Sequence, residues 1–136
     1  MKLKNHLLKS LGDFLVNEEL SGRLSRSRTR FVKLLNARLE EVERFRKELC
    51  EKYCEKDNDG KPVLNNNAYS IKDVEAFNEE YNDLMNEEFI IDETASQKEI
   101  LTNVKSILDN TKQTFKGVDA LLYDQWCEAF EEGDEN

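Results

Sequence analysis

The sequence predicts a mainly α protein with four to five helices, one of them very long, and a small β element. The 136 residues include only five glycines and one proline, so few positions force a helix to end. Charged residues make up 36% of the chain, yet apolar residues recur at steps of three and four, which is typical of amphipathic helices. The length suits one domain, which we expect over residues 1–130, followed by a frayed acidic tail at 131–136.

The first two predicted helices lie within the first 55 residues. The first covers about 3–18, where leucines recur at helical spacing. The second covers about 22–55, where no further glycine or proline occurs, and at about 1.5 Å per residue it is about 50 Å long. That is longer than a compact domain of this size needs. Its apolar seam, which the chain or a partner must cover, consists of Leu24, Phe31, Leu34, Leu35, Leu39, Val42, Phe45, Leu49 and Tyr53.

A small β element follows the long helix. Turn residues at 57–60 and Pro62 end the helix. Residues 62–71 contain two short extended segments around an Asn-rich turn, which predicts a hairpin. The β-prone residues 88–92 offer a third strand, because an isolated two-stranded hairpin is only marginally stable in water.

Three shorter helices complete the prediction. One covers about 73–87 and begins at Asp73, whose side chain is a good N-cap. The other two cover about 96–112 and 118–131, each with its own apolar stripe. On the last one, Tyr123, Trp126 and Phe130 form an aromatic cluster that is typical of a core, although Tyr123 also suits an interface.

Charge is distributed unevenly along the chain. Residues 1–47 hold 12 basic and 6 acidic residues, a charge of +6, whereas 48–136 hold 8 basic and 23 acidic residues, a charge of −15. Four basic residues recur at steps of three and four and so lie on one face of the long helix. We call them the basic stripe: Arg23, Arg26, Arg30 and Lys33. The stripe suits pairing with acidic helices in the same chain or across a dimer, contact with an acidic protein, or contact with phosphates. The formal net charge of −9 makes nucleic acid the least favoured of these partners.

The residue inventory favours neither metal nor cofactor. The only Cys and His residues are His6, Cys50, Cys54 and Cys127, without the paired spacing of a zinc site. Three cysteines also do not suggest a disulfide framework, so we interpret them as small buried apolar residues. The segment 55–66 resembles a calcium loop at its acidic positions, but Asn66 stands where the bidentate Glu belongs. We therefore expect a plain turn.

No pattern of residues indicates catalysis. The paired carboxylates are typical of solvated helix faces, and with one histidine the chain lacks the residues of common catalytic triads and di-metal sites. A phosphate-cradling glycine loop and a nucleophile elbow are also absent from the sequence. We predict a protein that is not an enzyme and takes no small-molecule substrate.

Two segments stand out in the chain, Lys56-Asp-Asn-Asp-Gly-Lys-Pro-Val63 and Phe77-Asn-Glu-Glu-Tyr81. They are the most specific part of a resemblance over about 20–130 to a family of small uncharacterised proteins from phages and prophages of Gram-positive bacteria. The resemblance implies a phage gene product that works in the cytoplasm of the bacterial host or in the virion. The sequence contains neither a signal-peptide pattern nor an apolar run of membrane-spanning length, so we expect no membrane association.

Three functional hypotheses follow. The first is non-catalytic protein–protein interaction through the long helix, with self-association and a dimer favoured. The second is an acidic anti-defence or host-takeover inhibitor that occupies a basic, nucleic-acid-binding surface of a host protein, and the third is nucleic-acid binding by the basic stripe. The candidate partner-binding residues are Arg23, Arg26, Arg30, Lys33, Phe31, Leu35, Val42, Phe45 and Tyr123.

Overall fold

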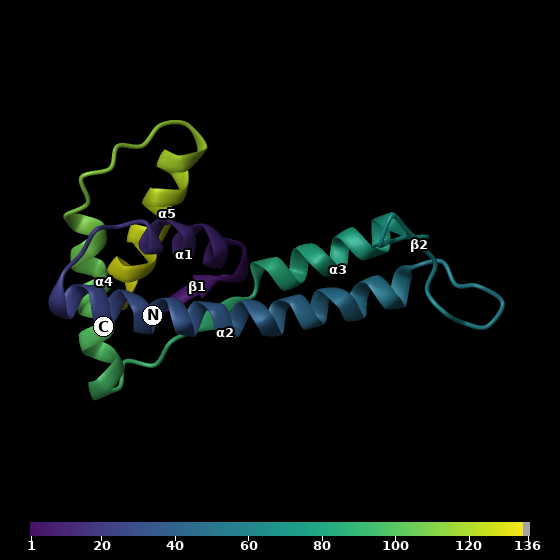
Figure 1. The fold of residues 1–136 in the computed structure, drawn as a ribbon, viewed down its shortest axis with the longest axis horizontal. Helices are drawn as coiled ribbons and strands as arrows, with labels where there is room; N and C mark the ends of the chain where they lie inside the picture. The colour runs from purple at the N-terminus through teal and green to yellow at the C-terminus, as the bar shows by residue number, and fades with distance from the viewer. Residues whose placement is uncertain (135–136) are drawn as a thin grey trace. The chain divides into compact units, whose positions relative to one another are not determined.

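The computed structural model describes residues 1–134 and confirms the mainly α fold. Its helices are α1 (Leu8–Val16), α2 (Gly22–Tyr53), α3 (Val74–Asn86), α4 (Ala95–Asp109) and α5 (Val118–Asp134), as Figure 1 shows. Its short strands are β1 (Lys2–Lys4), β2 (Leu64–Asn65), β3 (Ala68–Tyr69) and β4 (Glu88–Ile90), with one 3₁₀ turn, η1 (Asn5–Leu7).

The chain folds as two compact units that share α2. Unit 1 comprises Met1–Leu39 and Glu88–Asn136, and unit 2 comprises Glu40–Glu87. The expectation of a single domain over 1–130 stays a prediction. The predicted tail begins inside α5, which continues to Asp134, and residues 135–136 lie outside the described residues.

The long helix is confirmed almost to its predicted bounds. It was expected over about 22–55 and spans Gly22–Tyr53, about 48 Å at the usual rise per residue. It ends one residue before Cys54, which forms an isolated antiparallel bridge with Ile71. The backbone thus leaves the helix to join the β element of unit 2.

Unit 1 is built around one apolar core. The first half of α2 contributes Phe31 and Leu35, both with 0% of their surface exposed, and the ring of Phe31 lies 5.7 Å from that of Phe130 on α5. Helix α4 joins the same core through a hydrogen bond of 2.8 Å from Asn103 to Ser27 on α2. The other fully or nearly fully buried side chains include Leu3, Leu8, Leu11, Leu15, Ile91, Val104, Leu108 and Trp126.

The pairing of β1 with β4 corrects two sequence predictions. Residues 2–4, expected at the start of the first helix, form a strand, and the segment expected at 88–92 pairs with this strand instead of with the hairpin. The register is antiparallel, with Leu3 opposite Phe89. Leucines at 3, 7 and 8 fit a helix pattern, but Leu3 alternates with two exposed lysines as a strand residue does. Its partner lies far away in the sequence, where local spacing gives no information.

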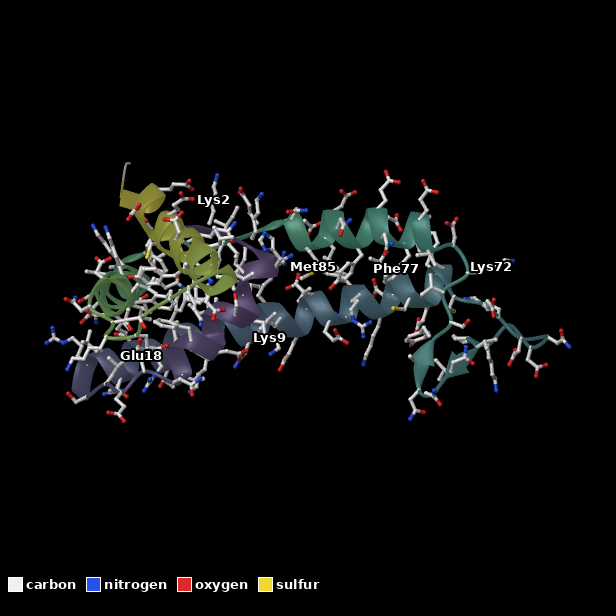
Figure 2. All side chains as sticks on the ribbon, turned by 90° about the horizontal axis from the view of Figure 1, so that it is seen from above. Lys2, Lys9, Glu18, Lys72, Phe77 and Met85 are labelled. Carbon is white, nitrogen blue, oxygen red and sulfur yellow. The ribbon has the colours of Figure 1, made fainter. Side chains whose placement is uncertain are left out.

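Unit 2 consists of the second half of α2, helix α3 and the β2–β3 hairpin. Figure 2 shows Phe77 and Met85 on the side of α3 that faces α2. Asp73 caps α3 as predicted, because its Oδ1 accepts from the Ala76 amide at 3.1 Å. The predicted hairpin forms, with Leu64 opposite Tyr69, and the Lys72 amide donates to the Tyr53 carbonyl at 2.8 Å, which ties the segment after the hairpin to the end of α2.

Candidate protein-interaction surfaces

The basic stripe lies on the exposed side of the first half of α2. All four side chains are exposed. Arg23 lies 3.9 Å from Glu99 on α4, with both side chains mostly in solvent, an arrangement worth roughly 0–1 kcal/mol. Among residues 1–134, Arg26, Arg30 and Lys33 form no ion pair. The stripe is therefore a solvated cationic surface, and only Arg23 pairs with an acidic helix of its own unit.

Two other basic residues of the same segment turn inward. The Arg28 guanidinium donates to the carbonyls of Leu15 and Glu18 at 2.9 and 2.6 Å, which satisfies carbonyl groups at and just beyond the end of α1. Arg38 Nε donates to Asn5 Oδ1 at 3.0 Å, and its guanidinium lies 5.9 Å from the centroid of the Phe89 ring. These two arginines hold unit 1 together and are not part of the stripe.

The apolar seam of α2 is mostly covered by the chain itself. Phe31 and Leu35 lie in the core of unit 1, and Val42 is buried in unit 2. The idea that a partner must cover the whole seam is therefore not supported by the structure. The exception is Phe45, which keeps 37% of its surface exposed.

Phe45 lines an acidic groove between α2 and α3 in unit 2. The groove has a volume of about 480 Å³, and its lining residues are Phe45, Glu48, Leu49, Lys52, Glu80, Asp83, Leu84 and Glu87. Phe45, Leu49 and Leu84 supply the apolar part. Four carboxylates and one ammonium supply the polar part, so the groove is negative overall.

One ion pair crosses this groove and sets its electrostatics. Lys52 Nζ lies 3.1 Å from Glu80 Oε1. Hydrogen bonds from Tyr53 and Lys52 lower the pKa of Glu80, so this carboxylate remains charged into the acidic range. Glu48 and Asp83 form no ion pair within the described part of the chain, and both are exposed. Their charges are available to a partner.

The remaining sequence candidates have structural roles. Tyr123 donates to the Leu108 carbonyl at 2.6 Å and stacks on Phe115 at 4.4 Å, and burial raises the pKa of Tyr123 to about 12. Asp57 Oδ1 accepts from the amides of Asp59 and Lys61, both at 2.9 Å, so its carboxylate stabilises the predicted turn. Cys50 and Cys54 are buried thiols that form no disulfide, and burial raises the pKa of Cys50, which keeps it protonated.

Two further features are missing from residues 1–134, a metal-binding cluster and a membrane-spanning helix. The described residues contain no cluster of three or more His, Cys, Asp or Glu side chains placed to hold a metal ion. Among the described helices, none combines the length and the apolarity required to cross a bilayer.

Sequence reasoning found Phe45 but missed the rest of the groove. The sequence pattern places Leu49 in the apolar seam, and the acidic residues of α3 fit either a solvated face or pairing with the basic stripe. A signal was present, because Glu80, Asp83 and Glu87 follow steps of three and four on one side of α3. Without the packing of α3 on α2, that spacing does not distinguish the acidic side of a groove from an ordinary exposed helix face.

No protein-family model, curated protein or solved structure matches this chain. The resemblance to small phage and prophage proteins therefore stays an expectation from the quoted segments. The functional proposal depends on the two surfaces described above.

Proposed function

We propose that this chain is a non-catalytic, phage-encoded protein that acts by protein–protein interaction and self-associates as a dimer. The observation that best supports it is the acidic groove, which the exposed side chain of Phe45 lines together with Leu49 and Leu84. Interface anchors are commonly aromatic side chains in apolar pockets surrounded by polar residues. The phage origin is supported only by the sequence resemblance.

Of the apolar candidates on α2, the proposed contact uses Phe45 and does not need Phe31, Leu35 or Val42. The chain itself buries most of the apolar seam of α2, so covering the seam does not require a partner. Covering the remaining exposed part of Phe45 contributes on the order of 1 kcal/mol. Leu84 is already buried at 6% exposure, so the rest of the affinity must come from the half-buried Leu49 and the charged residues of the groove.

Replacement of Phe45 tests this proposal. We expect the unmodified chain to be a dimer in size-exclusion chromatography with light scattering at tens of micromolar. Phe45→Ser should weaken the dimer about tenfold, since it removes the exposed apolar anchor of the groove. Leu121→Ser is the matched control, because Leu121 is 68% exposed on α5 outside the groove, and it should leave the dimer unchanged. A strict monomer for the unmodified chain would overturn self-association.

A second candidate function is nucleic-acid binding by the basic stripe. It is favoured by one observation, the exposure of Arg26, Arg30 and Lys33 without an ion pair among the described residues. It predicts retention of DNA or RNA at low salt that Arg26→Glu with Arg30→Glu abolishes. If the unmodified protein shows no retention at low salt, this candidate is eliminated.

A further inference from the structure

We propose that the acidic groove of one copy binds the basic stripe of a second copy, and that this contact occurs twice in a symmetric dimer. The proposal rests on the self-association in the proposed function and specifies which surfaces meet. Each chain carries one stripe in unit 1 and one groove in unit 2. Two copies related by a twofold axis therefore make two identical contacts, which closes the assembly as a dimer.

Charge complementarity favours the basic stripe, and not a second groove, as the surface that binds in the acidic groove. Unit 2 holds 7 basic and 14 acidic residues, a charge of −7, and residues 1–39 hold 9 basic and 3 acidic residues, a charge of +6. Two grooves facing each other would place carboxylates against carboxylates, which is unfavourable. A groove facing the stripe places arginines against carboxylates, and arginine presents forked donors to that group.

The spacing of the charges also matches. A twofold axis that brings the first half of each α2 against the second half of the other runs the two α2 helices antiparallel, so the stripe of one copy runs parallel to α3 of the other. The acidic residues of α3 follow steps of three and then four, and the stripe read forward from Arg23 to Arg30 follows the same steps. The charges therefore meet once per turn, about every 5 Å, and the expected pairs are Arg23 with Glu80, Arg26 with Asp83 and Arg30 with Glu87.

Apolar contact is available at the end of the stripe. Leu34 is half-buried and Ala37 is exposed, and helical spacing places both beside Arg30 and Lys33. Both side chains are apolar and suit packing against the exposed part of the Phe45 ring. The contact thus combines a short apolar centre with a charged surround, as protein interfaces generally do.

Reciprocal charge reversal tests the proposal. The stripe variant is Arg26→Glu with Arg30→Glu, and the groove variant is Glu48→Lys with Asp83→Lys. At about 50 mM salt, where charges act over more than 10 Å, the unmodified chain should be a dimer and each variant alone should be a monomer. An equimolar mixture of the two variants should restore a dimer, because each contact then joins opposite charges again.

Matched controls separate this effect from a change in net charge. Lys112→Glu with Lys116→Glu and Asp124→Lys with Glu128→Lys reverse exposed charges outside both surfaces. These controls should remain dimers, and their mixture should behave as each one does alone. Restoration of the dimer in the mixture of stripe and groove variants also shows that both variants are folded.

Each outcome discriminates between the proposals. A monomeric unmodified chain overturns self-association, and this inference with it. A dimeric unmodified chain whose stripe and groove variants also stay dimeric, or whose monomeric variants fail to combine although circular dichroism shows both folded, overturns this inference alone. Loss of nucleic-acid retention in the stripe variant, with the dimer unchanged, assigns the stripe to nucleic acid instead.

Discussion

Two arginines separated by a single residue, Arg26 and Arg28, have opposite surroundings. Arg26 points into solvent, whereas Arg28 donates to two backbone carbonyls at and beyond the end of α1 and to Ser25 Oγ at 3.1 Å. In a helix, a shift of two positions turns a side chain by about 200°. Arginine is therefore a solvent-exposed charge at position 26 and a hydrogen-bond donor to the backbone at position 28.

Replacing these two arginines should have unequal effects on stability. Arg28→Ala removes the guanidinium donor from the Glu18 carbonyl and leaves the Leu15 carbonyl with the Glu18 amide at 3.2 Å, so it should lower the free energy of unfolding by about 1–3 kcal/mol. Arg26→Ala should change it by less than about 0.5 kcal/mol. Urea titration monitored by the fluorescence of Trp126, the single tryptophan, would measure both. Equal effects of the two replacements would contradict the capping role.

At the scale of one side chain, Glu80 also makes unit 2 sensitive to pH. Its pKa is lowered in the folded chain by hydrogen bonds from Tyr53 and Lys52. A lowered folded-state pKa stabilises the fold above the unfolded-state value and ceases to do so as the pH falls through the folded-state value. The contribution is thus complete at neutral pH and is lost below about pH 4.

Glu80→Gln should make the stability of unit 2 less dependent on pH. At pH 7 the variant should unfold at lower urea concentration than the unmodified chain, because it lacks the charged partner of Lys52. The difference should shrink as the pH falls from about 5 to about 3. Urea titrations followed by far-UV circular dichroism measure this, with Glu79→Gln, an exposed neighbour, as control. A constant difference across that pH range would contradict the assignment.

At the scale of elements, the β2–β3 hairpin depends on two consecutive residues with positive φ. Asn66 and Asn67 have φ angles of 52° and 67°. These values suit a type I′ turn, whose twist matches that of the paired strands. Asparagine tolerates this conformation better than any other residue except glycine, which explains the Asn-rich segment in the sequence.

Substitutions in this turn should therefore have opposite signs. Asn67→Gly should leave the hairpin unchanged or stabilise it by a few tenths of a kcal/mol, whereas Asn66→Val should cost about 1–3 kcal/mol because a branched side chain is strained there. Hydrogen exchange of the Ser70 amide, which donates to the Val63 carbonyl at 3.0 Å, reports the opening of the hairpin. Faster exchange in Asn67→Gly than in Asn66→Val would refute the turn assignment.

At the scale of the whole molecule, the main apolar core belongs to unit 1 alone. All the buried residues of that core lie in 1–39 or 88–134, whereas unit 2 contributes a smaller buried set, which includes Val42, Cys50, Cys54 and Leu84. A smaller core gives a lower local free energy of opening. The two units should therefore differ in stability.

Truncating one core residue in each unit tests this difference. Leu35→Ala should lower the unfolding free energy reported by Trp126 by about 2–5 kcal/mol, because Leu35 is fully buried in unit 1. Leu84→Ala should leave the Trp126 transition nearly unchanged and speed hydrogen exchange within 40–87. A shift of the Trp126 transition by Leu84→Ala as large as that by Leu35→Ala would show that the units unfold together.

Local patterns predicted most of the fold, and distant pairings account for what they missed. The long helix, the Asp73 cap and the Asn-rich hairpin follow from spacing and residue type within a few positions, and the structure contains all three. The pairing of Leu3 with Phe89 joins segments whose sequences do not indicate each other. The groove was missed for the same reason, since it requires that α3 lie against one particular half of α2.

The pairing of β1 with β4 has a consequence for how the protein is made. Translation produces Leu3, Leu7, Leu8 and Leu11 well before β4, α4 and α5, which supply a large part of the core around these leucines. The leucines therefore cannot be fully covered until those later elements have been made. Closing so long a loop is entropically slow, so the nascent N-terminal segment should be a substrate for chaperones that bind leucine-rich stretches until translation passes residue 130.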